Sequence, residues 1–216
     1  MDKANKYIIW GSSGHAKVLA DIIYNEKSSI DTLFDNDPKA ISSISNIPLC
    51  VGIEGLNHWA NERKPLDEYL GAIAIGGAKG KDRLEIAQIF KKLGLRLPVI
   101  KHKTSSVALT AIINEGSHIL ANSVISADTI IGKMCIVNNS ASIDHECEID
   151  DGVHIAPGAV LCGCVKVDKH AMIGAGAVVL PRLKIGENSI IGAGSIVVRD
   201  VPPNSVVVGN PAKKIK

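Results

Sequence analysis

The sequence predicts a mixed fold in which a small parallel α/β domain precedes a β-helix built from six-residue repeats. Three observations indicate this. An aliphatic residue recurs at every sixth position from Val107 to Val197. A glycine-containing segment, Gly11–Gly14, follows an apolar run and precedes an amphipathic stretch near the N-terminus. All aromatic residues lie before residue 91, so the two halves differ in composition. We therefore expect two domains, residues 1–103 and 104–216.

The six-residue repeat carries two kinds of inward position. Period six excludes a helix, whose apolar positions recur at three and four. The residue four positions after each aliphatic residue is usually small, as at Ala141, Ala159 and Ala177. Alternate residues of a strand share a face, so each repeat supplies one large and one small inward side chain. The aliphatic positions are Val107, Ile113, Ile119, Ile125, Ile131, Val137, Ile143, Ile149, Ile155, Leu161, Val167, Ile173, Val179, Ile185, Ile191 and Val197.

Such short strands bury an apolar face only when they stack in coils around one continuous core. A narrow core has no room for aromatic rings, which agrees with their absence from this half. Glycine follows several of the aliphatic residues, and we expect it there because a tight corner favours glycine. The glycines are Gly132, Gly174, Gly186 and Gly192. Cys147 falls on a small inward position, which favours packing over a role as a thiol nucleophile.

The N-terminal domain alternates apolar runs with amphipathic stretches, which predicts a small parallel sheet of Rossmann-like type. A strand at Tyr7–Trp10 is followed by the glycine segment and then by a helix over 15–23. A second strand over 32–34 ends at Asp35. We expect further strands at 72–75 and 99–100 and, between them, a helix over 81–93 that ends before Gly94.

The glycine segment offers backbone N–H groups and a helix N-terminus to a phosphate. Asp35, at the end of the second strand, is placed to bind a sugar or a base. However, Ser13 and Ala16 stand where the G-x-G-x-x-G pattern has its second and third glycines. A tight turn without a ligand therefore remains an alternative, and an oxidoreductase is disfavoured.

Composition excludes several other classes. The formal net charge is +2 and aromatic residues are few, so no nucleic-acid surface is expected. The five cysteines are odd in number and irregularly spaced, which argues against a disulfide scaffold and for a reducing cytoplasm. Cys162 and Cys164 lack a second pair, so we expect no metal. No run of about 20 apolar residues predicts membrane insertion.

One histidine stands out among the seven. His145 falls at a predicted corner of the β-helix and is followed by Glu146, and a carboxylate bonded to one ring nitrogen fixes the tautomer of an imidazole. Histidine exchanges protons near neutral pH, which suits a general base. A solvated polar turn is the alternative. We expect His118 and His170, which have no carboxylate neighbour in the sequence, to be solvated on outer faces or corners.

These features resemble known families. The repeats, with the ending Arg199-Asp200-Val201-Pro202-Pro203-Asn204 and Val208-Gly209-Asn210-Pro211-Ala212-Lys213, resemble the hexapeptide acyltransferases. That resemblance implies a left-handed, three-sided β-helix, a homotrimer, and acetyl-CoA in the groove between adjacent prisms. Gly-Ser-Ser-Gly-His-Ala-Lys-Val from Gly11, followed by Leu-Phe-Asp-Asn-Asp-Pro from Leu33, resembles the opening of sugar O- and N-acetyltransferases of the sialic acid and bacillosamine pathways.

The same resemblance assigns roles to residues. The segment from Asn138 to Cys147 is similar to the catalytic segment of the bacillosamine enzymes, which makes His145 the base, Glu146 its partner and Asn138 a substrate contact. The nucleotide sugar would contact Ser13, Gly14 and His15, with Asp35 and Asn36 at the uridine and Gly76 in the same pocket. Acetyl-CoA would contact His154, Gly163, Ala175 and Ala193.

The resemblance thus implies an acetyl-CoA-dependent N-acetyltransferase. Its acceptor would be the 4-amino group of a UDP-linked aminodideoxy sugar used in bacterial glycan or glycoprotein assembly. O-acetylation of sialic acid is one rival. A non-catalytic trimer that binds a nucleotide sugar is another.

Overall fold

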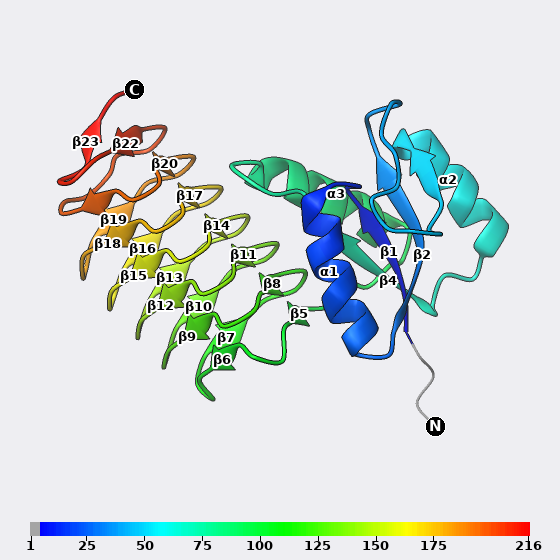
Figure 1. Ribbon diagram of the computed structural model, residues 1–216, viewed down its shortest axis with the longest axis horizontal. Helices are drawn as coiled ribbons and strands as arrows, with labels where there is room; N and C mark the ends of the chain where they lie inside the picture. The colour runs from blue at the N-terminus through cyan, green and yellow to red at the C-terminus, as the bar shows by residue number, and fades with distance from the viewer. Residues whose placement is uncertain (1–4) are drawn as a thin grey trace. The chain divides into compact units, whose positions relative to one another are not determined.

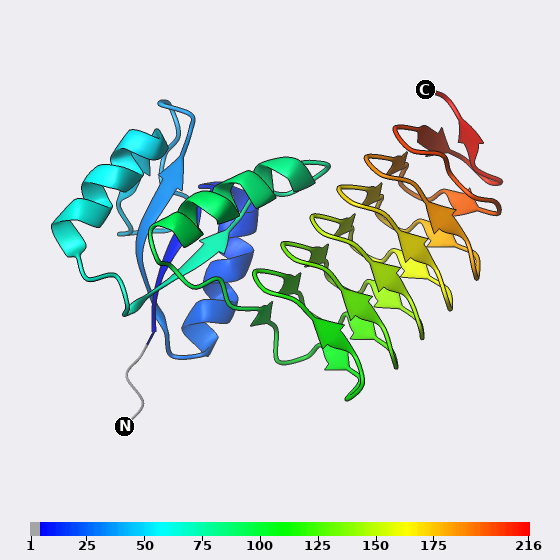
Figure 2. The ribbon, with the colours of Figure 1, turned by 180° about the vertical axis from the view of Figure 1, so that it is seen from behind.

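The computed structural model describes residues 5–216, which cluster into two compact units (Figures 1 and 2). The first comprises the described residues through Ile75 together with Glu85–Ile100. The second comprises Gly76–Leu84 and Lys101–Lys216. We expected Gly76–Leu84 in the N-terminal domain, but its contacts group it with the β-helix. The boundary between residues 103 and 104 stays a prediction.

The first unit is a Rossmann-like domain around a four-stranded parallel sheet. The strand order is β3-β2-β1-β4, with β1 at Lys6–Trp10, β2 at Ser29–Asp35, β3 at Leu49–Val51 and β4 at Tyr69–Ile73. Because β1 and β4 lie side by side, the segments after both strands emerge at one edge of the sheet. That edge carries the glycine segment.

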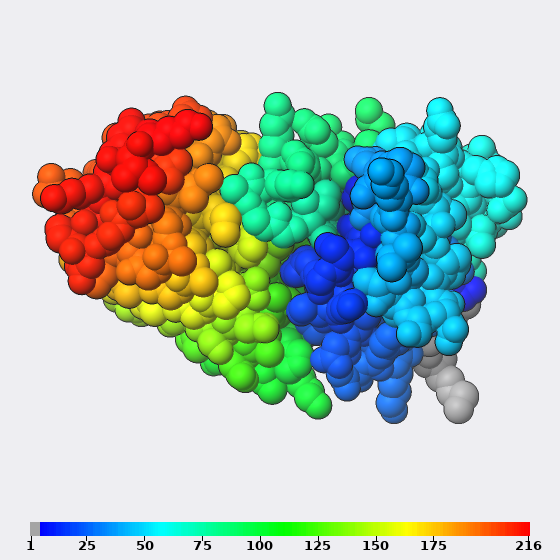
Figure 3. All heavy atoms as spheres, turned by 45° about the horizontal axis from the view of Figure 1, so that its top comes forward, coloured from blue at the N-terminus to red at the C-terminus, as the bar shows by residue number. Residues whose placement is uncertain are grey.

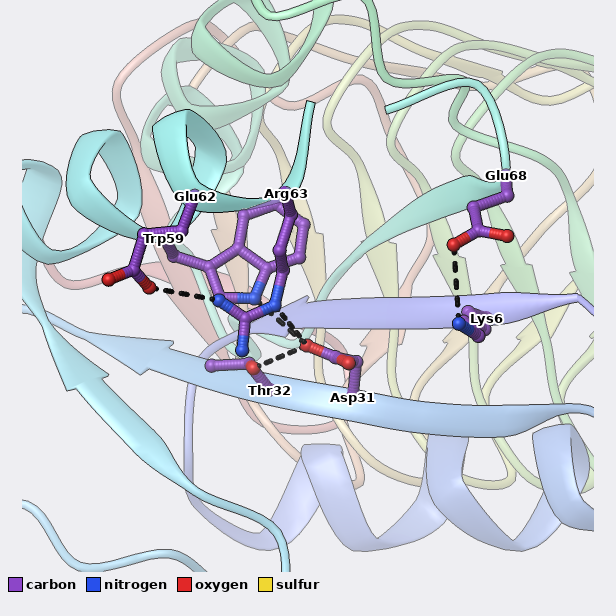
Figure 4. A network of polar contacts seen from close by, with 7 residues as sticks. All are labelled: Lys6, Asp31, Thr32, Trp59, Glu62, Arg63 and Glu68. Atoms are coloured by element: carbon purple, nitrogen blue, oxygen red, sulfur yellow. Dashed lines mark hydrogen bonds and ion pairs between the residues drawn. The ribbon is translucent and has the colours of Figure 1, made fainter. Parts of the chain in front are cut away.

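Helices α1 (Gly14–Asn25) and α2 (Gly52–Arg63) lie on opposite faces of this sheet (Figures 1 and 4). In α1, Ala16, Leu19, Ala20, Ile22 and Ile23 are buried, which is the three- and four-residue spacing of one helix face. Helix α3 (Gly80–Lys92) ends where Gly94 adopts φ +85 and its N–H bonds to the Lys91 carbonyl. The prediction that this helix ends before Gly94 is confirmed.

Two elements of this unit were missed, and one was assigned to the wrong sheet. Strand β3 has three residues, none fully buried, and α2 buries only Leu56, Trp59 and Ala60, so neither carries a strong period. The strand expected at 99–100 is β5 (Ile100–Lys101), which joins an eight-stranded sheet with β8 of the β-helix. In the first unit Leu70 bridges Arg96 instead, so the chain leaves the α/β sheet before residue 99.

A polar network fixes α2 against β2 (Figure 4). The Asp31 carboxylate accepts hydrogen bonds from Trp59 Nε1 at 2.9 Å and from the Thr32 hydroxyl at 2.7 Å. The Arg63 guanidinium lies 3.4 Å from the same carboxylate and 5.3 Å from the centroid of the Trp59 ring. Trp59 is 2% exposed, so its buried indole N–H has the partner that burial demands.

The second unit contains a left-handed β-helix in which two-residue strands form three parallel sheets. Each strand pairs with the strand 18 residues further on, as Ser142–Ile143 pairs with Val160–Leu161. Three six-residue repeats therefore make one coil, and all sixteen aliphatic positions lie at strand ends. The strands are β6 (Ser106–Val107), β7 (Ile112–Ile113), β8 (His118–Ile119), β9 (Val124–Ile125), β10 (Ile130–Ile131), β11 (Ile136–Val137), β12 (Ser142–Ile143), β13 (Glu148–Ile149), β14 (His154–Ile155), β15 (Val160–Leu161), β16 (Lys166–Val167), β17 (Met172–Ile173), β18 (Val178–Val179), β19 (Lys184–Ile185), β20 (Ile190–Ile191) and β21 (Ile196–Val197).

The corners differ from expectation in one respect. Every sixth residue from Gly116 to Gly194 has a positive φ, and these residues lie three positions after the aliphatic residue, not one. The glycines directly after an aliphatic residue are required by close approach. A Cβ at Gly132 would stand 2.7 Å from the Asp150 carbonyl carbon, and one at Gly174 would stand 2.5 Å from the Ile191 carbonyl oxygen. These glycines let successive coils touch.

The C-terminal segment closes one end of the β-helix (red in Figure 3). Strand β22 (Val206–Val208) continues the eight-stranded sheet beyond β20, and β23 (Lys213–Lys214) pairs with it in the antiparallel direction. The antiparallel strand covers the edge that β22 would otherwise expose in this sheet. No helix among residues 5–216 combines the length and apolar character needed to cross a bilayer.

Candidate active site

His145 lies at the corner between β12 and β13, with half of its side chain exposed. Its Nδ1 stands 2.9 Å from Glu146 Oε2. The backbone here is held by both neighbouring coils, because the Glu146 N–H bonds to the Ala127 carbonyl and the Cys164 N–H bonds to the His145 carbonyl, each at 2.9 Å. Glu146 occupies the left-handed corner position at φ +58, which turns its side chain beside the imidazole. The predicted pair is therefore formed.

The hydrogen bond fixes the state of the imidazole. A carboxylate only accepts, so Nδ1 carries the proton and the lone pair is on Nε2. Nε2 faces the next coil, where a Cβ on buried Gly163 would stand 2.6 Å from it. The ring therefore lies directly against the backbone of Gly163. This arrangement can accept a proton at Nε2 while the carboxylate holds Nδ1.

A second polar group lies on the eight-stranded sheet of the second unit, whose strands do not flank the His145 corner. Asn138 Nδ2 is 3.3 Å from His154 Nε2, and His154 Nδ1 is 3.3 Å from the Gly77 carbonyl. His154 is 7% exposed, and its pKa is lowered from 6.5 to about 4, first by burial and then by the positive charge of Arg83. At neutral pH this imidazole is uncharged. Its assignment to acetyl-CoA stays a prediction.

The remaining residues assigned to this unit lie in loops and corners. Gly76 belongs to the segment that groups with the β-helix and is half-buried. Ala175 and Ala193 are exposed corner residues 18 positions apart, so they occupy equivalent places on successive coils. Their small side chains leave the corner backbone accessible to a ligand. The prediction that His118 is solvated was wrong, because its side chain is buried and the residue is only 1% exposed.

The glycine segment of the first unit is tied to Asp35. The Ser12 N–H and hydroxyl bond to Asp35 Oδ2 at 2.9 and 2.8 Å, and the Asp37 N–H bonds to Oδ1 at 3.1 Å. Burial would raise the pKa of Asp35, but hydrogen bonds from Asp37, Ser12 and Asn36 hold it below its ordinary value. Gly11, at φ +103, passes so close to Ala74 that a Cβ would stand 2.6 Å from its carbonyl oxygen. The carboxylate thus braces the loop.

The first turn of α1 is open to a ligand. Ser13 precedes the helix without capping it through its side chain, and Ser13, Gly14 and Asn36 are exposed while His15 is half-buried. N–H groups at a helix start need partners and carry the positive end of the helix dipole. A built Cβ at Gly14 meets nothing within 4 Å, so packing does not explain this glycine. The segment suits a phosphate group.

The structure also brings together residues that the sequence analysis did not single out. The side chain of Cys164 lies with those of His145 and Glu146, and their donor atoms all lie within 4.8 Å of one another. The coil length is the signal that could have found it, since 146 and 164 differ by 18. The absence of a metal stays a prediction. Arg83, beside His154, had no local signal.

Two family models match this chain. Residues 6–89 match the PglD N-terminal domain, and residues 164–199 match the bacterial transferase hexapeptide (six repeats).

Several solved structures resemble the whole chain. The acetyltransferase domain of PglB from Neisseria gonorrhoeae FA1090, in complex with acetyl coenzyme A, is 30% identical with a TM-score of 0.86, and the match covers 99% of this chain and 100% of that one. A mutant of perosamine N-acetyltransferase from Caulobacter crescentus, in complex with CoA and GDP-perosamine, is 28% identical with a TM-score of 0.89, over 98% and 97% of the two chains. WeeI from Acinetobacter baumannii AYE is 26% identical with a TM-score of 0.86, over 98% and 100%.

Proposed function

The chain belongs to the sugar N-acetyltransferases that join a PglD N-terminal domain to hexapeptide repeats, and on that premise we propose that it acetylates the 4-amino group of a UDP-linked aminodideoxy sugar. Acetyl-CoA is the donor. The observation that carries the proposal is the His145–Glu146 pair, which is bonded at 2.9 Å on an exposed corner. The product serves bacterial glycan or glycoprotein assembly.

His145 acts as the general base. Its Nε2 takes a proton from the amine as the nitrogen attacks the acetyl carbonyl, and Glu146 stabilises the imidazolium that results. The bond to sulfur breaks as the amide bond forms, and the proton held by His145 passes to the departing thiolate. No electrons are exchanged with a further reagent, and no covalent bond to the protein forms.

The donor site uses two corners that border the sheet containing β12. Gly163, between β15 and β16, lies at the corner of His145 one coil further on, whereas Ala175 and Ala193 lie at the corner on the other side of that sheet. Acetyl-CoA supplies the acetyl thioester. Ala175 and Ala193 allow its pantetheine chain to approach the backbone, and Gly163 makes room for the His145 ring beside the thioester. The exposure of both alanines supports this, as does the position of Gly163 beneath the His145 ring. His154 lies one repeat further along the chain than the base, and we assign it to the same cofactor surface.

The acceptor contacts the two backbone segments that follow β1 and β2, the central strands of the first unit. The open first turn of α1 supports binding of the diphosphate by Ser13, Gly14 and His15. Asp35 and Asn36 read the base, and Gly76 lines the sugar pocket. Asn138 holds the sugar near its amine, because its carboxamide has one N–H not used by His154.

A homotrimer in the cytoplasm completes the proposal. The sheet that contains β12 presents Val124, Ser142, Val160, Val178 and Ile196 outward. The sheet that contains β13 presents Ile112 and Ile130 in its first two coils, but Glu148, Lys166 and Lys184 after them. An apolar, small-residue face favours contact with a second copy. Three copies around one axis would place a groove beside each His145 corner. Light scattering checks the mass.

The decisive experiment follows thiol release from acetyl-CoA with a panel of UDP- and GDP-linked 4-amino sugars and with CMP-sialic acid. Turnover with UDP-amino sugars supports the proposal. Turnover with GDP-amino sugars alone overturns the uridine assignment, and turnover with sialic acid alone overturns N-acetylation. Calorimetric titration with acetyl-CoA separates these results from a non-catalytic trimer, which would not bind it. Thermal shifts with UDP, GDP and CMP report nucleotide choice independently.

A further inference from the structure

Arg83 is a buried cation in the second unit. It is 1% exposed, and its guanidinium donates from Nε to the Met134 carbonyl at 2.9 Å and from Nη2 to the Gly152 carbonyl at 2.6 Å. Met134 and Gly152 occupy the same corner of the β-helix one coil apart, and both have a positive φ. The guanidinium holds its donors in a fixed plane. One side chain therefore fastens the segment Gly76–Leu84 to two successive coils.

The segment approaches the β-helix backbone to backbone. A Cβ on Gly80 would collide with the Gly152 carbonyl, and a Cβ on Gly152 would stand 3.0 Å from the Gly80 carbonyl oxygen and 2.8 Å from His170 Nδ1. Two glycines facing each other allow this contact. The position of the neighbouring Gly77 is consequently fixed relative to β14, which carries His154.

The Gly77 carbonyl is shared by two donors. Arg83 Nη1 lies 3.4 Å from it and His154 Nδ1 lies 3.3 Å from it. Because a carbonyl only accepts, Nδ1 of His154 carries the proton and Nε2 has a lone pair. Asn138 Nδ2 donates to that lone pair at 3.3 Å, while Asn138 Oδ1 accepts the Asn139 N–H at 2.8 Å. The carboxamide is thereby oriented at both ends.

The chain of hydrogen bonds requires a neutral His154. A proton on Nε2 would face the Asn138 amide protons, and the bond that orients the carboxamide would be lost. In the sheet, His154 lies between Ile136 and Met172, neither of which titrates. The charged group that acts on His154 is Arg83, from the segment Gly76–Leu84. Burial and this charge hold the pKa of His154 at about 4.

We infer that Arg83 is a positioning residue for acetyl transfer, which holds Gly77 in place and, through His154, orients the Asn138 carboxamide toward the acceptor. This rests on the proposed function, in which Asn138 contacts the sugar. Arg83 does not touch either substrate in this account. Its effect reaches the reaction through the hydrogen bonds that link Gly77, His154 and Asn138. In each of these bonds only one of the two groups can be the donor.

The kinetic test compares Arg83→Met and Arg83→Lys with Lys81→Met, an exposed substitution two residues away on α3. Arg83→Met should lower kcat by about 10- to 100-fold, since misplacing a contact group by an ångström costs about that much. Calorimetric stoichiometry with acetyl-CoA corrects for any inactive fraction. Arg83→Lys, which keeps the charge, should recover part of the loss, and Lys81→Met should match the wild type. An unchanged kcat in folded Arg83→Met protein overturns the inference.

A double-mutant cycle tests the route through His154. His154→Phe keeps a flat ring without the hydrogen bonds. If Arg83 acts through His154, the double variant loses no more kcat than the more impaired single variant. Losses that multiply would show that Arg83 acts by another route and would overturn the inference.

An NMR arm needs no substrate. ¹⁵N-labelled histidine spectra, with the His154 signal assigned by its loss in His154→Phe, should show the Nδ1–H tautomer in the wild type. In Arg83→Met the His154 titration should move to higher pH. Unchanged titration and tautomer in the folded variant refute the inference. If Arg83→Met does not fold, Arg83→Lys gives the tautomer result. A wild type without acetyltransferase activity refutes the proposed function instead, and these spectra still decide the role of Arg83.

Discussion

The imidazole of His145 lies directly against the backbone of Gly163, one coil further along the β-helix. A methyl group at position 163 would stand 2.6 Å from Nε2 and 2.7 Å from Cε1 of the ring. Gly163 does not have a positive φ, so its backbone accepts any residue, and only the ring excludes a side chain. The packing of a glycine therefore sets the place of the proposed base.

Replacing Gly163 by alanine should consequently impair catalysis more than stability. The ring must rotate away from Gly163 or from Glu146, and we expect kcat to fall by about 10- to 100-fold. Steady-state kinetics and the thermal midpoint measure the two effects. In a His145→Ala background the same substitution should cost nothing further, because the ring it displaces is gone. A loss of similar size in that background would contradict this account.

His145→Ala alone should lower turnover by about 10²- to 10⁴-fold, which is the usual contribution of a general base. Glu146→Gln should cost less, because the amide still contacts Nδ1 but does not stabilise the imidazolium. Single-turnover rates with acetyl-CoA and the preferred amino sugar measure both. His58→Ala is the matched control, since His58 is an exposed histidine that pairs with Glu62 in α2. Near wild-type turnover in His145→Ala would remove the mechanism.

His154 should make the fold sensitive to acid. The pKa of His154 is about 4 in the folded protein, against 6.5 when unperturbed. Between these two pH values the imidazole is protonated in the unfolded state but not in the folded state. Stability is therefore lost as the pH falls from 6.5 toward 4, by on the order of 3 kcal/mol for a shift of this size. Denaturant unfolding at pH 7 and at pH 4.5 measures it. His154→Gln should show a smaller difference between the two, and an equal difference would contradict the prediction.

Much of the second unit could be predicted because its information is local. Each repeat specifies its own strand and corner, so sixteen weak signals reinforce one another. The His145–Glu146 pair is made by neighbours in sequence and was found in the same way. The corner glycines were misread because close approach between coils is not visible within one repeat. Gly163 was expected only as an acetyl-CoA contact. Its packing against His145, and the place of Cys164 beside Glu146, could be recognised only from the 18-residue coil length.

The place of the segment Gly76–Leu84 against the β-helix could not be predicted from local sequence patterns. Arg83 donates a hydrogen bond to the Gly152 carbonyl, 69 positions away in the chain. No sequence pattern near Arg83 predicts that its guanidinium is buried. Gly76–Leu84 follows a strand of the α/β sheet, so its grouping with the β-helix overrides local continuity. In α2 only Leu56, Trp59 and Ala60 are buried, so the apolar stripe is too short to predict a helix, which explains why that helix was missed.

The buried cysteines should be chemically silent, which bears on whether the reaction uses a thiol. Burial raises the pKa of Cys147 to about 11 and that of Cys135 to about 12, so at pH 8 neither thiol forms an appreciable amount of thiolate. Cys147 also donates to the Cys162 carbonyl at 3.2 Å, as an inward packing residue does. Iodoacetamide should therefore label Cys164 and Cys162 in the native protein well before these two, as peptide mass spectrometry would reveal. Cys147→Ala should retain its kcat with only modest loss of stability. Rapid labelling of Cys147, together with inactivity of the alanine variant, would instead point to a covalent acetyl-enzyme.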